Sequence, residues 1–434
     1  MKSQPATLVQ PDRVHRTCYS DAEIFEQELT NIFEKTWVYC GHESQLRKTG
    51  DYASVQIGRQ PMIMVRDESG AIQVLYNRCP HRGAQLCVRR DGNTGEQFMC
   101  SYHGWRFNLE GRLLGVPIEE GYKNTGMELT DPAFSMRRAA RVESYRGFVF
   151  ARLVEQGPSL LDWLGGARAG IDDMCDRSPE GEVEIIPVCH RIVQRSNWKL
   201  FMENQVDVLH AGITHESAGR AAMAVEQQLQ QTTGTAPSEY KFLSTLALPL
   251  SKFAEMLESR NFPHGHALIA AYLEQPKDAD ALEYEKVMRQ KYGKEKADEI
   301  LSRNVHHVVL YPGVSLQPPL LQLRVIRPVS VDSTISEIWH FRLKGASEAM
   351  YRNALQYFNL INSPATLVNA DDLENWSRCQ RGASSTASEW ISFHRGLGAE
   401  IDGPSAIIGK AGSEAPLRNQ YRAWLEYMNN GERQ

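Results

Sequence analysis

Two pairs of metal-binding side chains constrain the fold of this chain more than any other feature. Cys79-x-His81 and Cys100-x-x-His103 are separated by 18 residues. Four such ligands can bind one metal centre only if two loops approach each other from opposite sides. Residues 40–153 predict a fold of this kind, because short β-branched and aromatic runs alternate there with Gly, Asp and Asn turns. We expect a small antiparallel β domain that carries both pairs on its loops.

Three kinds of site are compatible with two cysteines and two histidines. A structural zinc site usually has CxxC followed by HxxxH, and the chain contains no CxxC. Buried cysteines and histidines without a metal do not easily explain two pairs on two loops. A Rieske [2Fe–2S] cluster uses two thiolates on one iron and two imidazoles on the other, which suits the order Cys-His, Cys-His. The residues favour this cluster and leave zinc as the alternative.

A second metal centre is expected in the rest of the chain. A protein that only carries electrons needs about 100 residues, yet 331 residues follow His103. Among them is Asp207-x-x-His210-x-x-x-x-His215. Five residues of continuous helix turn by about 500°, which would leave the two rings about 140° apart. We therefore predict that the helix ends or bulges between the two histidines, where Gly212 is followed by the β-branched Ile213 and Thr214. We also predict that Asp207 orients the imidazole of His210 without binding the metal.

A carboxylate is needed to complete the two-histidine facial triad of a non-haem Fe(II) oxygenase. The segment DDLENW, residues 371–376, offers two neighbouring candidates. On a helix, Asp372 shares a face with Trp376 and Cys379, whereas Asp371 shares the more polar face. Because the more apolar face should be buried, the sequence predicts a mononuclear iron site formed by His210, His215 and Asp372.

The motifs CPHRG and CSYHGW strongly resemble those of the Rieske-type non-haem iron aromatic ring-hydroxylating oxygenases. The similarity extends from EIFEQELTNIFEKTWVYCGH near the N-terminus to YRAWLEYM near the C-terminus. It implies a [2Fe–2S] cluster with Trp105 packed beside it, and it agrees with Asp372 as the third iron ligand. The implied cluster ligands are Cys79, His81, Cys100 and His103.

The expected fold class is α+β with three parts. Residues 1–39 are predicted to form a helical segment that packs on the catalytic domain. Residues 40–155 are predicted to form the all-β Rieske domain. Residues 156–434 are predicted to form a catalytic domain with an antiparallel sheet of the helix-grip, START-like type, including a charged surface helix or helix pair at 276–304.

The resemblance implies the large (α) subunit of a multicomponent dioxygenase. Such an enzyme uses O2 and electrons that pass from NAD(P)H through a reductase or ferredoxin. The resemblance also implies a head-to-tail trimer, with or without a small β subunit (α3β3 or α3). Asp207 would then link His103 of the partner subunit to His210. One departure is Leu209, because many relatives have Tyr immediately before the first iron-binding histidine.

The substrate is predicted from a few residues only. The resemblance is strongest to oxygenases of aromatic acids, and the segment LLQLRVIRP places Arg324 and Arg327 on a predicted strand. Arg324 is in roughly the position where a guanidinium could bind a carboxylate with two parallel hydrogen bonds. By the same resemblance, Asn204 matches a polar residue that the family keeps near the iron. We expect an aromatic carboxylate as substrate; the alternatives are a neutral aromatic hydrocarbon, or a monooxygenase or demethylase reaction.

Charge and hydropathy exclude other classes of function. The formal net charge is −5 and there is no basic block, which disfavours nucleic-acid binding. No apolar run reaches the roughly 18 residues of a membrane span, and the N-terminus lacks the apolar core of a signal peptide. We expect a cytoplasmic protein without a disulfide scaffold.

Overall fold

The chain divides into two compact units. The computed structural model describes residues 4–234, 236–271, 278–303, 305–410 and 412–430. One unit consists of residues 29–160, and the other combines residues 1–28 with residues 161–434. Of the N-terminal residues, only those up to Glu28 therefore belong to the same unit as the C-terminal part of the chain. The domain boundaries predicted at residues 39 and 155 stay predictions.

Short antiparallel strands build the smaller unit, residues 29–160. One sheet has four strands in the order β6-β5-β4-β7, and two further sheets have three strands each, in the orders β11-β12-β3 and β10-β9-β8. Along β4, buried Val55 and Ile57 flank exposed Gln56, as expected for a half-buried strand. The strands are β3 (Val38–His42), β4 (Asp51–Ile57), β5 (Gln60–Arg66), β6 (Ile72–Tyr76), β7 (Asp91–Asn93), β8 (Gln97–Met99), β9 (Arg106–Asn108), β10 (Leu113–Gly115), β11 (Arg141–Tyr145) and β12 (Phe148–Arg152).

A nine-stranded antiparallel sheet is the centre of the larger unit, in the order β13-β19-β18-β17-β16-β15-β14-β22-β21. Together with the all-β unit, it confirms the predicted α+β class. The strands are β13 (Val183–Gln194), β14 (Leu257–Asn261), β15 (Ala267–Ala271), β16 (Val305–Leu310), β17 (Val314–Gln317), β18 (Gln322–Ser330), β19 (Ser333–Leu343), β21 (Ile401–Asp402) and β22 (Ile407–Lys410). A separate small sheet joins β1 (Val9–Gln10), β2 (Arg13–His15) and β20 (Trp390–Ser392).

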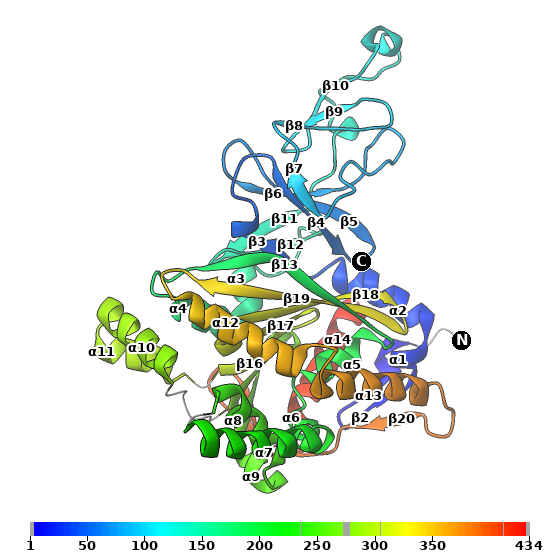
Figure 1. Ribbon diagram of the computed structural model, residues 1–434. Helices are drawn as coiled ribbons and strands as arrows, with labels where there is room; N and C mark the ends of the chain where they lie inside the picture. The colour runs from blue at the N-terminus through cyan, green and yellow to red at the C-terminus, as the bar shows by residue number, and fades with distance from the viewer. Residues whose placement is uncertain (1–3, 235, 272–277, 304, 411, 431–434) are drawn as a thin grey trace. The chain divides into compact units, whose positions relative to one another are not determined.

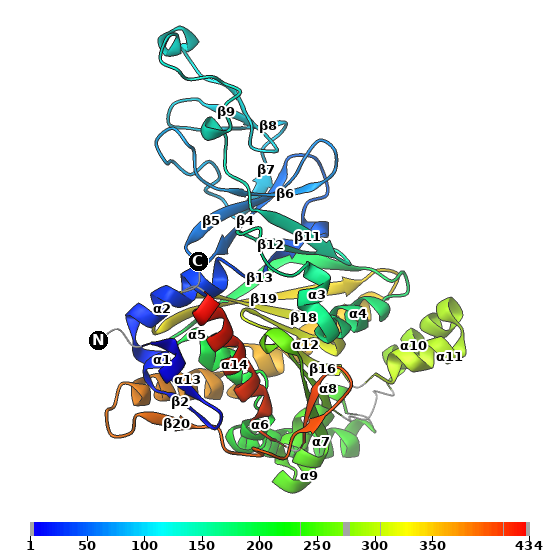
Figure 2. The same ribbon diagram turned by 180° about the vertical axis from the view of Figure 1, so that it is seen from behind.

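Helices surround this sheet. Figure 1 shows α12 and α13 following one another along one side of it. Figure 2, in which the molecule is seen from behind, shows α14 beside α5. The helices are α1 (Thr17–Ser20), α2 (Ala22–Glu28), α3 (Leu160–Leu164), α4 (Ala169–Asp176), α5 (Trp198–Asn204), α6 (Val208–Thr214), α7 (Glu216–Thr233), α8 (Ser238–Ser244), α9 (Leu250–Glu255), α10 (Ala279–Tyr292), α11 (Lys294–Leu301), α12 (Glu348–Tyr357), α13 (Leu367–Ala383) and α14 (Ala415–Asn430). Two π-helical turns follow α2 and α12, at Leu29–Phe33 and Phe358–Asn362.

Two sequence expectations about helices can be checked directly. The charged segment predicted at 276–304 forms the pair α10 and α11, while residues 276, 277 and 304 lie outside the described residues. In the described part of the chain, no helix has the length and apolar character needed to cross a membrane.

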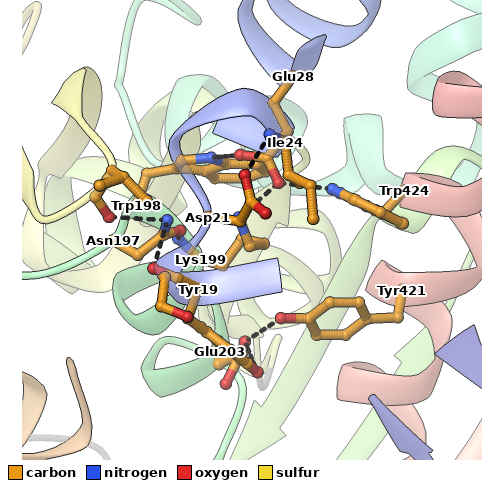
Figure 3. Close-up of polar contacts among 12 residues, drawn as sticks. Tyr19, Asp21, Ile24, Glu28, Asn197, Trp198, Lys199, Glu203, Tyr421 and Trp424 are labelled. Carbon is orange, nitrogen blue, oxygen red and sulfur yellow. Dashed lines mark hydrogen bonds and ion pairs between the residues drawn. The ribbon is translucent and has the colours of Figure 1, made fainter. Parts of the chain in front are cut away.

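A fully buried carboxylate, Glu28, joins three helices of the larger unit. Its Oε1 lies 2.5 Å from Nζ of Lys199 and accepts a hydrogen bond of 2.7 Å from the indole of Trp424. Its Oε2 accepts a hydrogen bond of 2.8 Å from the indole of Trp198. Figure 3 shows how these groups gather around Glu28, which ties α2 to α5 and α14.

A second buried carboxyl lies at the end of α5. Glu203 Oε1 accepts hydrogen bonds from the hydroxyls of Tyr19 at 2.8 Å and Tyr421 at 2.9 Å. Burial raises the pKa of Glu203 to about 7, against the opposing effect of the two hydroxyls. These contacts fix the C-terminal end of α5, immediately before Asn204.

Candidate functional site

The two Cys-His loops of the smaller unit have the same backbone hydrogen bonds. In the first loop, the amide of Gly83 donates to the carbonyl of Cys79 at 2.9 Å; in the second, Gly104 donates to Cys100 at 2.9 Å. Both glycines have positive φ angles, +78° and +69°, which residues with a Cβ rarely adopt. The local sequence thus folds two equivalent turns, each of which presents one cysteine and one histidine.

The four predicted cluster residues lie together. Both thiols are buried. Burial has the largest effect in raising the pKa of Cys79, and the hydrogen bond and charge of the neighbouring Cys100 act in the same direction. The rings of His81 and His103 lie 4.7 Å apart between centroids, and Trp105 stacks on His81 at 4.8 Å with an interplanar angle of 7°. The two thiols therefore lie next to each other, the two imidazoles lie next to each other, and Trp105 packs in the same cluster as the thiols. Two thiols and two imidazoles are the donor set of a Rieske cluster.

The three predicted iron ligands also lie together, in the larger unit. Asp372 Oδ1 lies 3.5 Å from Nε2 of His210 and 3.2 Å from Nε2 of His215. One ligand atom from each residue lies within 4.8 Å of the other two. Burial would raise the pKa of Asp372, but the hydrogen bonds and charges of the two imidazoles hold it well below its ordinary value.

The helix α13 explains why Asp372 and not its neighbour takes this place. Buried residues recur every four positions along it, at Val368, Asp372, Trp376 and Gln380, so they form one inward-facing stripe. Asp371 lies beside this stripe, with 36 % of its side chain exposed and its Oδ2 at 3.6 Å from Nδ1 of His215. The buried face of the helix therefore carries the carboxylate that lies against both imidazoles.

The helix ends between the two histidines, as predicted. Of the expected break residues Gly212, Ile213 and Thr214, α6 continues through Gly212 and ends at Thr214. His215 itself is the junction between α6 and α7, with φ −107° and ψ 14°. Gly212 is needed for packing: a Cβ there would lie 2.9 Å from Leu250 of α9. The change of direction at His215 brings its ring to 5.6 Å from that of His210.

Asp207 contacts His210 through a different atom than expected. The prediction that its carboxylate orients the imidazole differs from the structure, where the backbone carbonyl of Asp207 makes a short contact with Nδ1 of His210. The nearest carboxylate oxygen is 4.0 Å from Nδ1. The carboxylate instead caps α6 at the amide of Leu209 and accepts from Arg395 Nη2 at 3.0 Å. Arg395 is distant in the chain and was not predicted from the sequence.

Asn204 lies directly against the three ligands. Its side-chain nitrogen is 2.9 Å from Nε2 of His210 and donates to Asp372 Oδ1 at 3.1 Å. Its Oδ1 accepts a hydrogen bond from Gln205 at 3.0 Å, and Gln205 Oε1 accepts from the hydroxyl of Ser315 at 3.1 Å. Polar contacts therefore lead from the candidate iron ligands to strand β17.

The two candidate arginines have different environments. Arg327 is 3.2 Å from the carboxylate of Glu337 and so belongs to an ion pair within the sheet. Arg324 is buried, and its Nε donates to Gln322 at 3.1 Å. Burial lowers the pKa of Arg324 to about 10, and the negative charge of Asp372 opposes this shift.

His307 is a further residue of this region that the sequence analysis missed. Burial holds its pKa well below its ordinary value, and the nearby charges of His306, Arg324 and His210 act in the same direction. The residue has intermediate exposure. The effects of Arg324 and His210 on His307 place it in the neighbourhood of the candidate iron ligands.

The residues present fit both metal groups. Among the described residues, the only carboxylate-histidine group with metal-binding separations is His210, His215 and Asp372. A histidine that binds a metal through one ring nitrogen usually donates a hydrogen bond through the other. His215 departs from this pattern, because its Nδ1 is buried and has no hydrogen-bond partner. Two imidazoles and one carboxylate are the donor set of a non-haem Fe(II) site.

Comparisons with known proteins agree with this chemistry. Residues 36–128 match the family described as the Rieske [2Fe-2S] domain, and residues 183–430 match the family described as the ring hydroxylating alpha subunit (catalytic domain). The predicted Rieske cluster and mononuclear iron are confirmed by these matches.

Similar proteins cover nearly the whole chain. The 2-halobenzoate 1,2-dioxygenase large subunit of Burkholderia cepacia is 30% identical over 96% of this chain and 90% of its own length. The anthranilate 1,2-dioxygenase large subunit of Acinetobacter baylyi is 32% identical over 96% of this chain and 90% of its own length. A solved naphthalene 1,2-dioxygenase with bound indole has the same fold, with a TM-score of 0.80 and 24% identity over 98% of this chain and 93% of the other.

These relatives cover almost the full length of the sequence. Both family matches agree with the geometry of the two sites. The chain therefore belongs to the aromatic ring-hydroxylating dioxygenase α subunits, the Rieske non-haem iron oxygenases that draw electrons from a reductase.

Proposed function

We propose that this α subunit hydroxylates an aromatic carboxylate. Cys79, His81, Cys100 and His103 hold the cluster in this proposal, and His210, His215 and Asp372 hold the mononuclear iron. When bound, the cluster supplies single electrons and the iron supplies the activation of dioxygen. The protein's own contribution is to bind the substrate, fix its orientation and exclude water.

One observation carries the choice of an acid over a neutral hydrocarbon: Arg324 is a buried cation close enough to Asp372 for the two charges to interact. Its two terminal nitrogens have no hydrogen-bond partner among the described residues. A buried charge without a partner is costly, so a ligand carboxylate that accepts both terminal N–H groups would stabilise it. Relatives named for 2-halobenzoate and anthranilate support the same class of substrate.

Replacement of Arg324 with Met tests this choice. We expect Arg324→Met to raise KM for an aromatic acid by roughly 100-fold, because a charge-assisted bidentate contact contributes about 1.5–3 kcal/mol, while kcat for a neutral arene changes little. Oxygen uptake with a surrogate reductase measures both quantities. Arg327→Met is the matched control on the same strand, because Arg327 already pairs with Glu337. Equal effects of the two substitutions on KM for the aromatic acid would contradict the proposal.

Product analysis separates the dioxygenase from the alternatives. With labelled O2, two labelled oxygens on neighbouring ring carbons support dioxygenation. One labelled oxygen, or loss of a methyl group, would instead support a monooxygenase or demethylase.

The assembly around the α subunit is part of the proposal. We infer a trimer, as α3 or with a small β subunit as α3β3, that receives electrons from a reductase or ferredoxin. In this arrangement, Asp207 links His103 of the partner subunit to His210. The contact between the Asp207 carbonyl and Nδ1 of His210 supports one half of that link.

Asp207→Ala is expected to keep both metal groups but to slow steady-state turnover by roughly 100-fold, because the carboxylate that would reach His103 of the partner subunit is lost, while the backbone carbonyl that contacts His210 is kept. The measurement is the rate of a single turnover that starts from the fully reduced protein. Arg395→Met is the control, because it removes the cation beside the carboxylate and keeps Asp207 itself. A single-turnover rate equal to that of the wild type would refute this role for Asp207.

A further inference from the structure

A row of polar side chains crosses four adjacent strands of the large sheet. Gln317 of β17 is opposite Gln322 of β18, which is opposite His340 of β19. Because Val308 pairs with Leu316, His307 of β16 lies beside Gln317. Gln317 makes a short contact with Nε2 of His307, and Gln322 Nε2 lies 3.3 Å from Nε2 of His340. Polar side chains inside a sheet are costly unless they are paired, and this row pairs along its length.

Asn362, in the π-helical turn after α12, joins the middle of the row. Its side-chain nitrogen donates to Gln322 Oε1 at 2.8 Å and lies 3.3 Å from Gln317 Oε1. Asn362 is itself buried. The same Gln322 oxygen accepts the hydrogen bond of 3.1 Å from Nε of Arg324. Gln322 is therefore the point where the row meets the buried arginine.

The row fixes which end of the Gln322 amide faces Arg324. Burial lowers the pKa of His340 to about 4, so its imidazole is neutral near pH 7. A neutral Nε2 that carries no proton can accept a hydrogen bond from the amide nitrogen of Gln322. The amide oxygen must then face the two donors, Asn362 and Arg324.

The neutrality of Gln322 leaves the charge of Arg324 available. Arg327, on the same strand, forms an ion pair with the carboxylate of Glu337 at 3.2 Å. Arg324 meets an amide instead, and within the described ranges it forms no ion pair. An amide oxygen can hold Nε in place without cancelling the positive charge.

We propose that Gln322, held by His340 and Asn362, is a positioning residue. It orients Arg324 toward the carboxylate of the substrate and leaves the positive charge of Arg324 available to that carboxylate. Gln322 thus sets the preference for aromatic acids over neutral arenes. The inference rests on the proposed function, because it presupposes that Arg324 binds the substrate acid.

The decisive variant is Gln322→Glu, which changes almost no volume but places a carboxylate against Arg324. Dissociation constants of a panel of benzoates and the matched benzamides are measured by calorimetry on the anaerobic holoenzyme. We expect the acids to bind roughly 30-fold more weakly to Gln322→Glu, with the amides changed by less than about threefold. Gln322→Leu, which removes the acceptor without adding charge, should raise KM for the acids roughly tenfold and leave kcat nearly unchanged.

Gln194→Glu is the matched control, because Gln194 is equally buried on β13 of the same sheet and does not contact Arg324. Thermal unfolding of each variant verifies that it folds. If the wild type binds benzoates no better than benzamides, the proposed acid substrate is wrong. If the wild type prefers the acids and Gln322→Glu keeps that preference, the positioning role is wrong and the proposed function stands.

Discussion

Replacing His215 with Ala is expected to remove the mononuclear iron, to leave the Rieske cluster in place, and to lower product formation by roughly a thousandfold or more. His215 is buried, and its Nε2 is 3.2 Å from the carboxylate of Asp372. Without this imidazole, two ligands remain, too few for a facial triad. Iron content and the visible spectrum of the cluster are the two measurements.

The two adjacent aspartates provide a matched control for the same site. Asp372→Asn should lose the iron, since its carboxylate lies against both imidazoles. Asp371→Asn should keep the iron, because this neighbour lies beside the buried stripe of α13. Equal iron content in the two variants would show that the carboxylate ligand is wrongly assigned.

A second large effect is expected on stability. Glu28→Gln should lower the free energy of unfolding of the larger unit by about 3–5 kcal/mol, because it removes the carboxylate that pairs with the buried ammonium of Lys199. Lys199 lies 2.5 Å from Glu28, and both side chains are almost completely buried. Urea unfolding followed by tryptophan fluorescence measures the change, since Trp198 and Trp424 donate to the same carboxylate.

Two further variants separate this buried ion pair from a general effect of removing charge. Glu216→Gln removes an exposed partner of Arg220 and should change the free energy of unfolding by less than about 1 kcal/mol. The double substitution Glu28→Gln with Lys199→Met removes both charges and should recover part of the stability lost in the single variant. A Glu28→Gln protein as stable as Glu216→Gln would show that the buried ion pair of Glu28 and Lys199 does not stabilise the fold.

The parts of the site that were predictable depend on local rules. The Cys-His spacing predicted two loops, and each loop needs only its own glycine to form. Asp372 was predictable because the helical repeat separates it from Asp371 within one element. In each case, the decisive interaction lies within a few residues along the chain.

The rest of the site depends on contacts between distant segments. The break between the two histidines was predicted from Gly212 and the β-branched residues after it, but its exact place depends on packing: the helix packs on Leu250 at Gly212 and ends at Thr214, next to His215. Arg395 meets Asp207 from 188 residues away. The polar row is visible only once the register of four strands is known, because its members are separated by turns, and Asn362 reaches it from a π-helical turn that no sequence pattern indicated.

Two separate iron centres in one chain require a fixed ratio of iron to acid-labile sulfide, which is measured on the isolated wild-type protein. Two bridging sulfides belong to the cluster and none to the mononuclear site. We expect about three iron atoms and about two sulfides per chain. About two of each would leave no iron for His210, His215 and Asp372, and iron without sulfide would leave no cluster; either result would rule out two iron centres in this chain.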